Sequence, residues 1–149
     1  MKITYTIYIA CKPEEVFIWI NEPDKAMHWQ KGVKNTEIIK ETHEKIGTTF
    51  KEEMEENGKN LIMYGEITDY IPNKLISFHL ESKIHRVNVS YTVAGDVNKS
   101  KVKVESTIRW KFPMNLICLV IGHKIKKNIL RQTQSEFIEL KKLCEINRN

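Results

Sequence analysis

Cysteine, glycine and proline are all scarce in this chain. The few cysteines argue against disulfide and zinc sites, and the few glycines argue against a phosphate-binding loop. The three cysteines among 149 residues, Cys11, Cys118 and Cys144, have no CxxC spacing and lie within apolar patterns. We therefore expect buried thiols in a reducing compartment, and neither a disulfide framework nor a zinc site. The six glycines form no Gly-rich loop of the kind that binds phosphate groups.

Long hydrophobic runs are also missing. No stretch approaches the roughly 20 consecutive apolar residues that span a bilayer. Residues 1–11 alternate polar and apolar side chains, which indicates a strand and not the continuous apolar core of a signal peptide. Together with the cysteine pattern, this predicts a cytoplasmic protein.

The excess of positive charge is modest, and the histidines form no recognisable site. The net charge is +5, and the lysines are spread along the chain without interleaved aromatic residues, so we expect no nucleic-acid partner. The histidines without metal-ligand spacing are His28, His43, His79, His85 and His123. No Ser-His-Asp or Cys-His pairing is visible, so we expect no metal or cofactor and assign no catalytic residue.

What the chain does have is a long run of alternating strands from Lys34 to Phe112. Turns at Asn57-Gly58, Pro72-Asn73-Lys74, Ser82-Lys83 and 95–100 divide the run into antiparallel hairpins. The predicted opposite pairs are Met54 with Leu61, Glu52 with Met63, Phe50 with Gly65, Leu80 with His85, Phe78 with Val87, Ile76 with Val89, Val93 with Val102, Tyr91 with Val104, and His85 with Trp110. The Pro72 turn should bring Ile71 and Ile67 alongside Ile76 and Leu80. Because side chains alternate between faces, this register gives one broad apolar face.

Helices flank this run on both sides. Pro13 with Glu14 and Glu15 should open a short helix, and Pro23 should open a second one that Gly32 ends. A long helix from Pro113 to about Ile146 closes the chain, with an apolar stripe at Leu130, Phe137, Leu140 and Cys144. The length fits a single domain over residues 1–149.

This order of elements resembles the START-like (SRPBCC, helix-grip) superfamily, in particular its polyketide cyclase/dehydrase-like branch. The matching segments are IACKPEEVF at 9–17, Pro23 to Trp29, IGTTF at 46–50, GEITDYIPNKL at 65–75 and LKKL at 140–143. The resemblance implies an α+β helix-grip fold, in which a curved seven-stranded antiparallel sheet wraps around the C-terminal helix and two short helices follow the first strand. It also implies a deep cavity that holds a lipid, sterol, quinone, hormone or polyketide. A minority of such proteins catalyse cyclisation, dehydration or hydrolysis, without a fixed catalytic motif.

Few inward positions of the predicted sheet are polar: Glu52, His85, Ser106 and the hydroxyls of Tyr5 and Tyr91. Glu52 and His85 should lie roughly 14 Å apart across three strand spacings, so they could hold two ends of one ligand. Alternatively, His85 is only hydrogen-bonded to water, and Glu52 reaches solvent. The predicted ligand-binding residues are Glu52, Met54, Met63, Phe78, His85, Val87, Tyr91, Trp110, Leu116 and Val120.

The segment 114–122 is apolar nearly all round, and three interpretations stay open. The first is a buried wall or a lid hinged at Gly122. The second is peripheral membrane contact, because a basic cluster follows at His123, Lys124, Lys126, Lys127 and Arg131. The third is a dimer contact, so monomer and dimer both remain open.

Three functions fit these observations. The first is binding or transport of a hydrophobic small molecule or lipid between the sheet and the last helix. The second is a cyclase/dehydratase-type enzyme, with His85 as general acid/base and Glu52 or Tyr91 polarising the substrate. The third is a protein-interaction module like the branch of this superfamily that stimulates a chaperone ATPase. Exposure of 114–122 would support the third.

Overall fold

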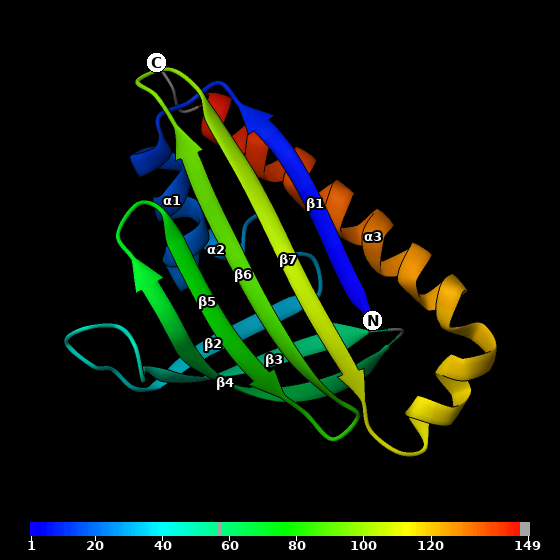
Figure 1. Ribbon diagram of the computed structural model, residues 1–149. Helices are drawn as coiled ribbons and strands as arrows, with labels where there is room; N and C mark the ends of the chain where they lie inside the picture. The colour runs from blue at the N-terminus through cyan, green and yellow to red at the C-terminus, as the bar shows by residue number, and fades with distance from the viewer. Residues whose placement is uncertain (57, 147–149) are drawn as a thin grey trace.

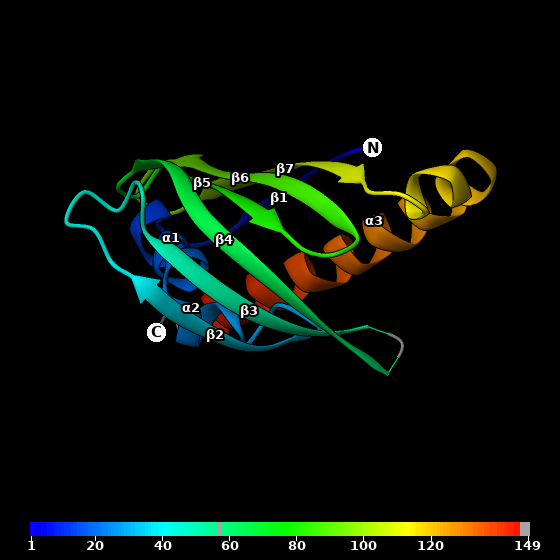
Figure 2. The same cartoon turned by 90° about the horizontal axis from the view of Figure 1, so that it is seen from below.

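The computed structural model describes residues 1–56 and 58–146 and confirms the predicted α+β helix-grip architecture. The elements, in chain order, are β1 (Lys2–Ile9), α1 (Pro13–Asn21), α2 (Pro23–Ala26), β2 (Val33–Lys40), β3 (Thr49–Glu56), β4 (Lys59–Ile71), β5 (Leu75–Glu81), β6 (His85–Gly95), β7 (Ser100–Trp110) and α3 (Met114–Ile146). The strands form one seven-stranded antiparallel sheet in the order β1-β7-β6-β5-β4-β3-β2. Figure 1 shows α3 crossing behind the sheet beside β1. Figure 2 shows the sheet curving around α1, α2 and the C-terminal part of α3.

The helices begin where the sequence indicates. Pro13 occupies the first turn of α1, where its missing N–H costs nothing, and Glu14 and Glu15 favour the positive end of the helix. The second helix is shorter than predicted, because α2 ends at Ala26 and the chain continues in turns. In these turns, Trp29 N–H donates to the Ala26 carbonyl oxygen at 3.2 Å, a contact between residues three apart.

Two of the predicted hairpins have the predicted register. Met54 lies opposite Leu61 and Glu52 opposite Met63, on either side of the turn at Asn57-Gly58. Asn57 itself lies outside the described residues. In the last hairpin every predicted pair is observed, from Val93 with Val102 to His85 with Trp110.

The register of the other two hairpins corrects the prediction. Leu80 pairs with Val87 instead of His85, because Ser82 closes a longer turn: its hydroxyl accepts hydrogen bonds from the main-chain N–H groups of Ile84 and His85. The shift is an even number of residues, so every side chain keeps its predicted face. Between β4 and β5, a bulge after Ile67 places Ile67 opposite Phe78, Tyr70 opposite Ile76 and Gly65 opposite Leu80.

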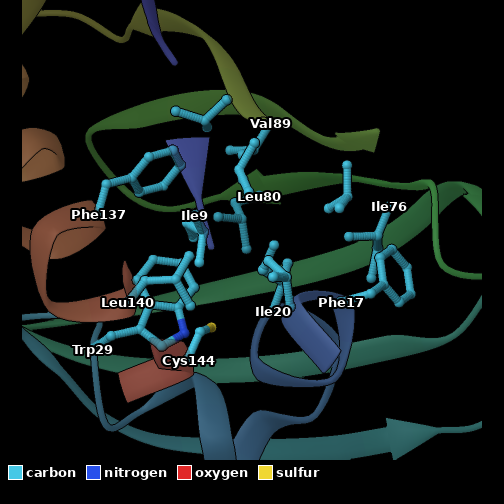
Figure 3. Close-up of a cluster of buried hydrophobic side chains, with 14 of the residues drawn as sticks. Ile9, Phe17, Ile20, Trp29, Ile76, Leu80, Val89, Phe137, Leu140 and Cys144 are labelled. Atoms are coloured by element: carbon cyan, nitrogen blue, oxygen red, sulfur yellow. The ribbon is translucent and has the colours of Figure 1, made fainter. Parts of the chain in front are cut away.

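The core lies between the concave face of the sheet and the C-terminal part of α3. Phe137, Leu140 and Cys144 are fully buried along the predicted stripe, and Figure 3 shows them facing Ile9 and Trp29. The Phe137 ring lies 6.0 Å from Trp29 at a steep angle. Trp29 Nε1 donates a hydrogen bond to the Trp19 carbonyl oxygen at 2.9 Å, so its polar atom is satisfied. This packing fixes α3 against α1 and the turn after α2.

Candidate functional site

A cavity of about 200 Å³ lies between the two short helices and the sheet strands β2 to β6. Its apolar walls are Ile20, Phe50, Ile67, Ile76 and Phe78. The rings of Phe50 and Phe78 meet edge to face at 5.9 Å. These side chains come from α1 and from inward positions of β3, β4 and β5, so strand alternation places them on one wall.

Gly65 makes room for one of these aromatic walls. It lies opposite Phe50 in the β3–β4 hairpin, and a Cβ at position 65 would fall 2.3 Å from Phe50 Cζ. Carbon atoms that are not bonded to each other do not approach that closely, so a side chain at position 65 would displace the Phe50 ring. The glycine therefore sets the position of Phe50 at the cavity wall.

Glu52 is the acidic group on the inner face of β3. Alternation along β3 turns Glu52 into the cavity, opposite Met63 on β4 and Thr36 on β2. Its burial raises the pKa of the carboxyl to about 7, because the charged form loses its hydration there. Near neutral pH this carboxyl therefore exists in both protonated and ionised forms, and it can donate or accept a proton.

Tyr91 is another polar residue in the cavity lining, beside Asn21, Glu22, Thr36, Glu41, Lys45 and Thr48. Burial raises its pKa, and the negative charges of Glu136 and Glu52 raise it further, while a hydrogen bond with the Gln30 side chain opposes the shift. Tyr91 therefore stays a neutral phenol that can donate a hydrogen bond. Gln30, after α2, also lines the cavity and adds a side-chain amide.

Glu136 on α3 is a second acid with a raised pKa, although it is not among the residues that line the cavity, and it was not predicted from the sequence. Burial raises the pKa of Glu136 to about 7, although its hydrogen bond from the Lys31 main-chain N–H, 2.7 Å long, favours the charged form. The available signal was helical spacing, because Glu136 lies four residues before Leu140 and next to the buried stripe. Ala26 and Gln30 were also missed, because nothing in a short helix indicates which sheet face it covers.

The structure divides the predicted ligand-binding residues into three groups. Glu52, Phe78 and Tyr91 line the cavity. The residues outside its lining are Met54, Met63, Val87, His85 and Trp110; of these, Met63 and Val87 belong to the hydrophobic core, and Met54 and Trp110 pack against it. His85 and Trp110 lie at the far end of β6 and β7 with ring centroids 5.1 Å apart, and His85 Nδ1 is 2.7 Å from Ser82 Oγ. Trp110 Nε1 is buried and has no hydrogen-bond partner within the described part of the chain.

Leu116 and Val120, the third group, lie on the surface. Leu116 is 52% exposed and Val120 is 77% exposed, and neither lines the cavity. A buried wall at 114–122 is therefore wrong: α3 has a non-helical residue at Ile121, next to the predicted hinge Gly122, and its first turns extend past the sheet (Figure 2). Cys118 in this segment is accordingly half-buried, whereas Cys11 and Cys144 are buried thiols as predicted.

Within the described ranges 1–56 and 58–146, no cluster of three or more His, Cys, Asp or Glu side chains is placed to hold a metal ion. No helix in those ranges combines the length and the apolar character needed to cross a bilayer.

The sequence pattern of one protein family, described as "Activator of Hsp90 ATPase homolog 1-like protein", matches residues 10–114. The chain belongs to this family. The match runs from the end of β1 to the start of α3, so it includes every element that lines the cavity. It also confirms the predicted relation to the START-like superfamily. In the comparison with curated protein sequences, none matches this chain.

Solved structures agree with this Activator of Hsp90 ATPase homolog 1-like fold. TTHA0849 from Thermus thermophilus is 14% identical with a TM-score of 0.79, and all of both chains is covered. A START superfamily protein from Mycobacterium smegmatis is 14% identical with a TM-score of 0.81, covering 97% of each chain. The ZhuI aromatase/cyclase from Streptomyces sp. R1128 is 12% identical with a TM-score of 0.77, covering 97% of this chain and 93% of that one. At such low identity these likenesses show the fold.

Proposed function

We propose that this protein binds a hydrophobic small molecule or lipid group in the cavity between α1, α2 and β2 to β6. The observation that carries the proposal is a cavity with apolar walls whose polar lining residues include Glu52, Tyr91 and Gln30. Ligand sites have this composition, because apolar walls supply affinity and a few polar groups fix orientation. Membership of a START-like family supports the same function.

The cavity favours a compact ligand. Its volume of about 200 Å³ is below the roughly 300–1,000 Å³ of most ligand pockets, although an engineered cavity of about 150 Å³ is enough for benzene. We therefore expect a molecule, or one end of a molecule, with one or two rings or a short branched chain. A single hydroxyl or carbonyl on it would meet Glu52 and Tyr91.

Titration with 1-naphthol, followed by NMR of isotope-labelled isoleucine methyl groups, tests the proposal. The methyl resonances of Ile20, Ile67 and Ile76 should shift, because these side chains line the cavity. Ala26→Leu fills the cavity and should abolish the shifts. Ala94→Leu is the matched control, because Ala94 is exposed on β6. Absence of shifts in the unmodified protein, or equal loss in both variants, would count against the proposal.

A second candidate function is proton transfer on a bound ligand, and the pKa of Glu52 favours it. A general base works best when its pKa lies near the working pH, and that of Glu52 is about 7. In such a reaction the Glu52 carboxylate removes a proton from a carbon next to a carbonyl, while Tyr91 donates a hydrogen bond to the oxygen that gains charge. Glu52 replaces His85 in this role, since His85 does not line the cavity.

Deuterium exchange of 2-tetralone in D₂O tests the second candidate. The protein should accelerate exchange of the hydrogens next to the carbonyl, and Glu52→Gln should remove the acceleration while the ketone still binds. Loss of binding and exchange together would favour a carrier over an enzyme.

A further inference from the structure

The start of α3 and the residue pair before it form an exposed apolar surface, which we call the apolar tip. Its members are Phe112, Leu116, Ile117, Leu119, Val120 and Ile121, all of them exposed. Leu119 is 83% exposed, the highest exposure among the large hydrophobic side chains of the described residues. Figure 2 shows these turns, in yellow, projecting beyond the sheet.

The apolar side chains of the tip cover a face of the helix that is wider than a single stripe. Residues in an α-helix are 100° apart, so 116, 117, 119, 120 and 121 cover an arc of about 200° around the axis. A groove on a partner protein covers one face of a helix. The hydrocarbon side of a lipid interface takes up a broad apolar face of a helix, and the exposed ring of Phe112 beside it adds to that face.

The charge next to the tip is of one sign. No Asp or Glu occurs between Glu105 and Glu136. The basic side chains in that interval are Arg109, Lys111, His123, Lys124, Lys126, Lys127 and Arg131. Lys111 is held by Glu81, but Lys124, Lys126 and Lys127 are exposed and in no ion pair with the described residues.

We propose that the apolar tip inserts into an anionic membrane surface, with the lysines after it contacting lipid headgroups. Apolar insertion and attraction to anionic lipids add in this kind of binding. A second copy of the chain fits less well, because pairing two tips would bring two clusters of lysines together. The tip contributes no residue to the cavity wall, so the proposal does not depend on the ligand.

Vesicle co-sedimentation tests this proposal. The protein should bind vesicles of equal parts phosphatidylcholine and phosphatidylglycerol, should bind phosphatidylcholine vesicles weakly, and should be released by high salt. Leu119→Gln with Val120→Gln should abolish binding. Ile138→Gln is the control, because Ile138 is 60% exposed on the same helix outside the tip.

The lysines are tested in the same assay. Replacing Lys124, Lys126 and Lys127 by Gln should weaken binding by about fivefold for each charge removed. Replacing Lys40, Lys59 and Lys101, which are exposed elsewhere, changes the net charge equally and should have a much smaller effect.

Three results would overturn the proposal. They are equal binding to both kinds of vesicle, equal loss in the control variants, and no vesicle binding. If no vesicle binding is seen, analytical ultracentrifugation distinguishes the two other occupants of the tip. A dimer that Leu119→Gln dissociates would indicate a second copy of the chain, and a monomer would indicate a different protein partner. The 1-naphthol titration should be unchanged in every tip variant, so failure here is distinct from failure of the cavity proposal.

Discussion

The main-chain N–H of Lys31 donates a hydrogen bond to the Glu136 carboxylate across 2.7 Å, which joins the chain after α2 to the middle of α3. The Gln132 side chain donates to the Lys31 carbonyl oxygen, and the Lys31 ammonium bonds the Ser135 hydroxyl. One residue is thus held by three side chains of α3. Tyr91 also contacts α3, because its ring centroid lies 6.2 Å from that of Phe137.

Stability should fall as the pH rises from about 5 to 8. Burial raises the pKa of Glu52 from 4.5 to about 7, so the folded state holds a proton that the unfolded chain has already lost in this range. The contribution of this proton to the free energy of unfolding is complete below the pKa of Glu52 in the unfolded chain. It is lost as the pH rises through 7, which lowers the free energy of unfolding by up to about 3 kcal/mol. Urea unfolding at a series of pH values should show a shallower fall in Glu52→Gln. Glu53→Gln, on the opposite face of β3, should keep the fall, and an unchanged slope in Glu52→Gln would refute the assignment.

Ligand charge should matter above pH 7. When Glu52 is ionised, an anionic ligand in the cavity meets a like charge in a poorly hydrated site. We expect 1-naphthoate to bind about tenfold more weakly at pH 8.5 than at pH 5.5, while 1-naphthol changes little. Calorimetric titration measures both, and Glu52→Gln should remove the difference. A persistent difference in that variant would assign the effect to another group, with Glu136→Gln as the next variant to measure.

Phe137→Ala should destabilise the protein by roughly 3–5 kcal/mol, because it leaves a cavity where α3 meets the sheet. The Phe137 side chain is 1% exposed and contacts the rings of Tyr5, Trp29 and Tyr91. Ile138→Ala, at the exposed neighbouring position, should change the unfolding free energy by less than about 0.5 kcal/mol. Similar losses in the two variants would contradict the observed orientation of α3.

Gly65→Ala should cost roughly 1–3 kcal/mol, because the new methyl group overlaps the Phe50 ring. Phe50→Leu removes the overlapping atoms, so the double variant should lose less stability than the sum of the single changes. Gly122→Ala serves as the control, since a Cβ there meets only ordinary contacts at 3.8 Å. Strict additivity at positions 50 and 65 would show that the two do not interact.

Much of the sheet could be predicted from local pattern. The alternation of side chains and the turns at Gly58 and 95–100 determine which residues face inward, and the observed pairs Glu52 with Met63 and Val93 with Val102 agree. The predicted partner of Leu80 was wrong, but its side chain lies on the predicted face of the sheet. The reason is that the turn closed by Ser82 shifts the register by an even number of residues. Alternation is a property of the backbone, so it survives errors of this kind.

The position of the cavity could not be predicted in this way. From the strand pattern, Glu52 and His85 were expected to hold two ends of one ligand, but the cavity forms where α1 and α2 cover β2 to β6, and Glu52 lines it whereas His85 does not. Which end of a sheet two short helices cover depends on contacts between distant segments, such as Trp29 with Phe137. No local pattern encodes such contacts.

The sequence by itself determined the strand faces, the helix starts at Pro13 and Pro23, and the buried stripe of α3. Only the tertiary structure decided that the charges of Glu52 and Glu136 act on Tyr91, and that Leu119 and Val120 stay exposed. The physical reason is that hydropathy measures how poorly a side chain tolerates water. Whether that side chain finds a partner depends on where the rest of the chain lies.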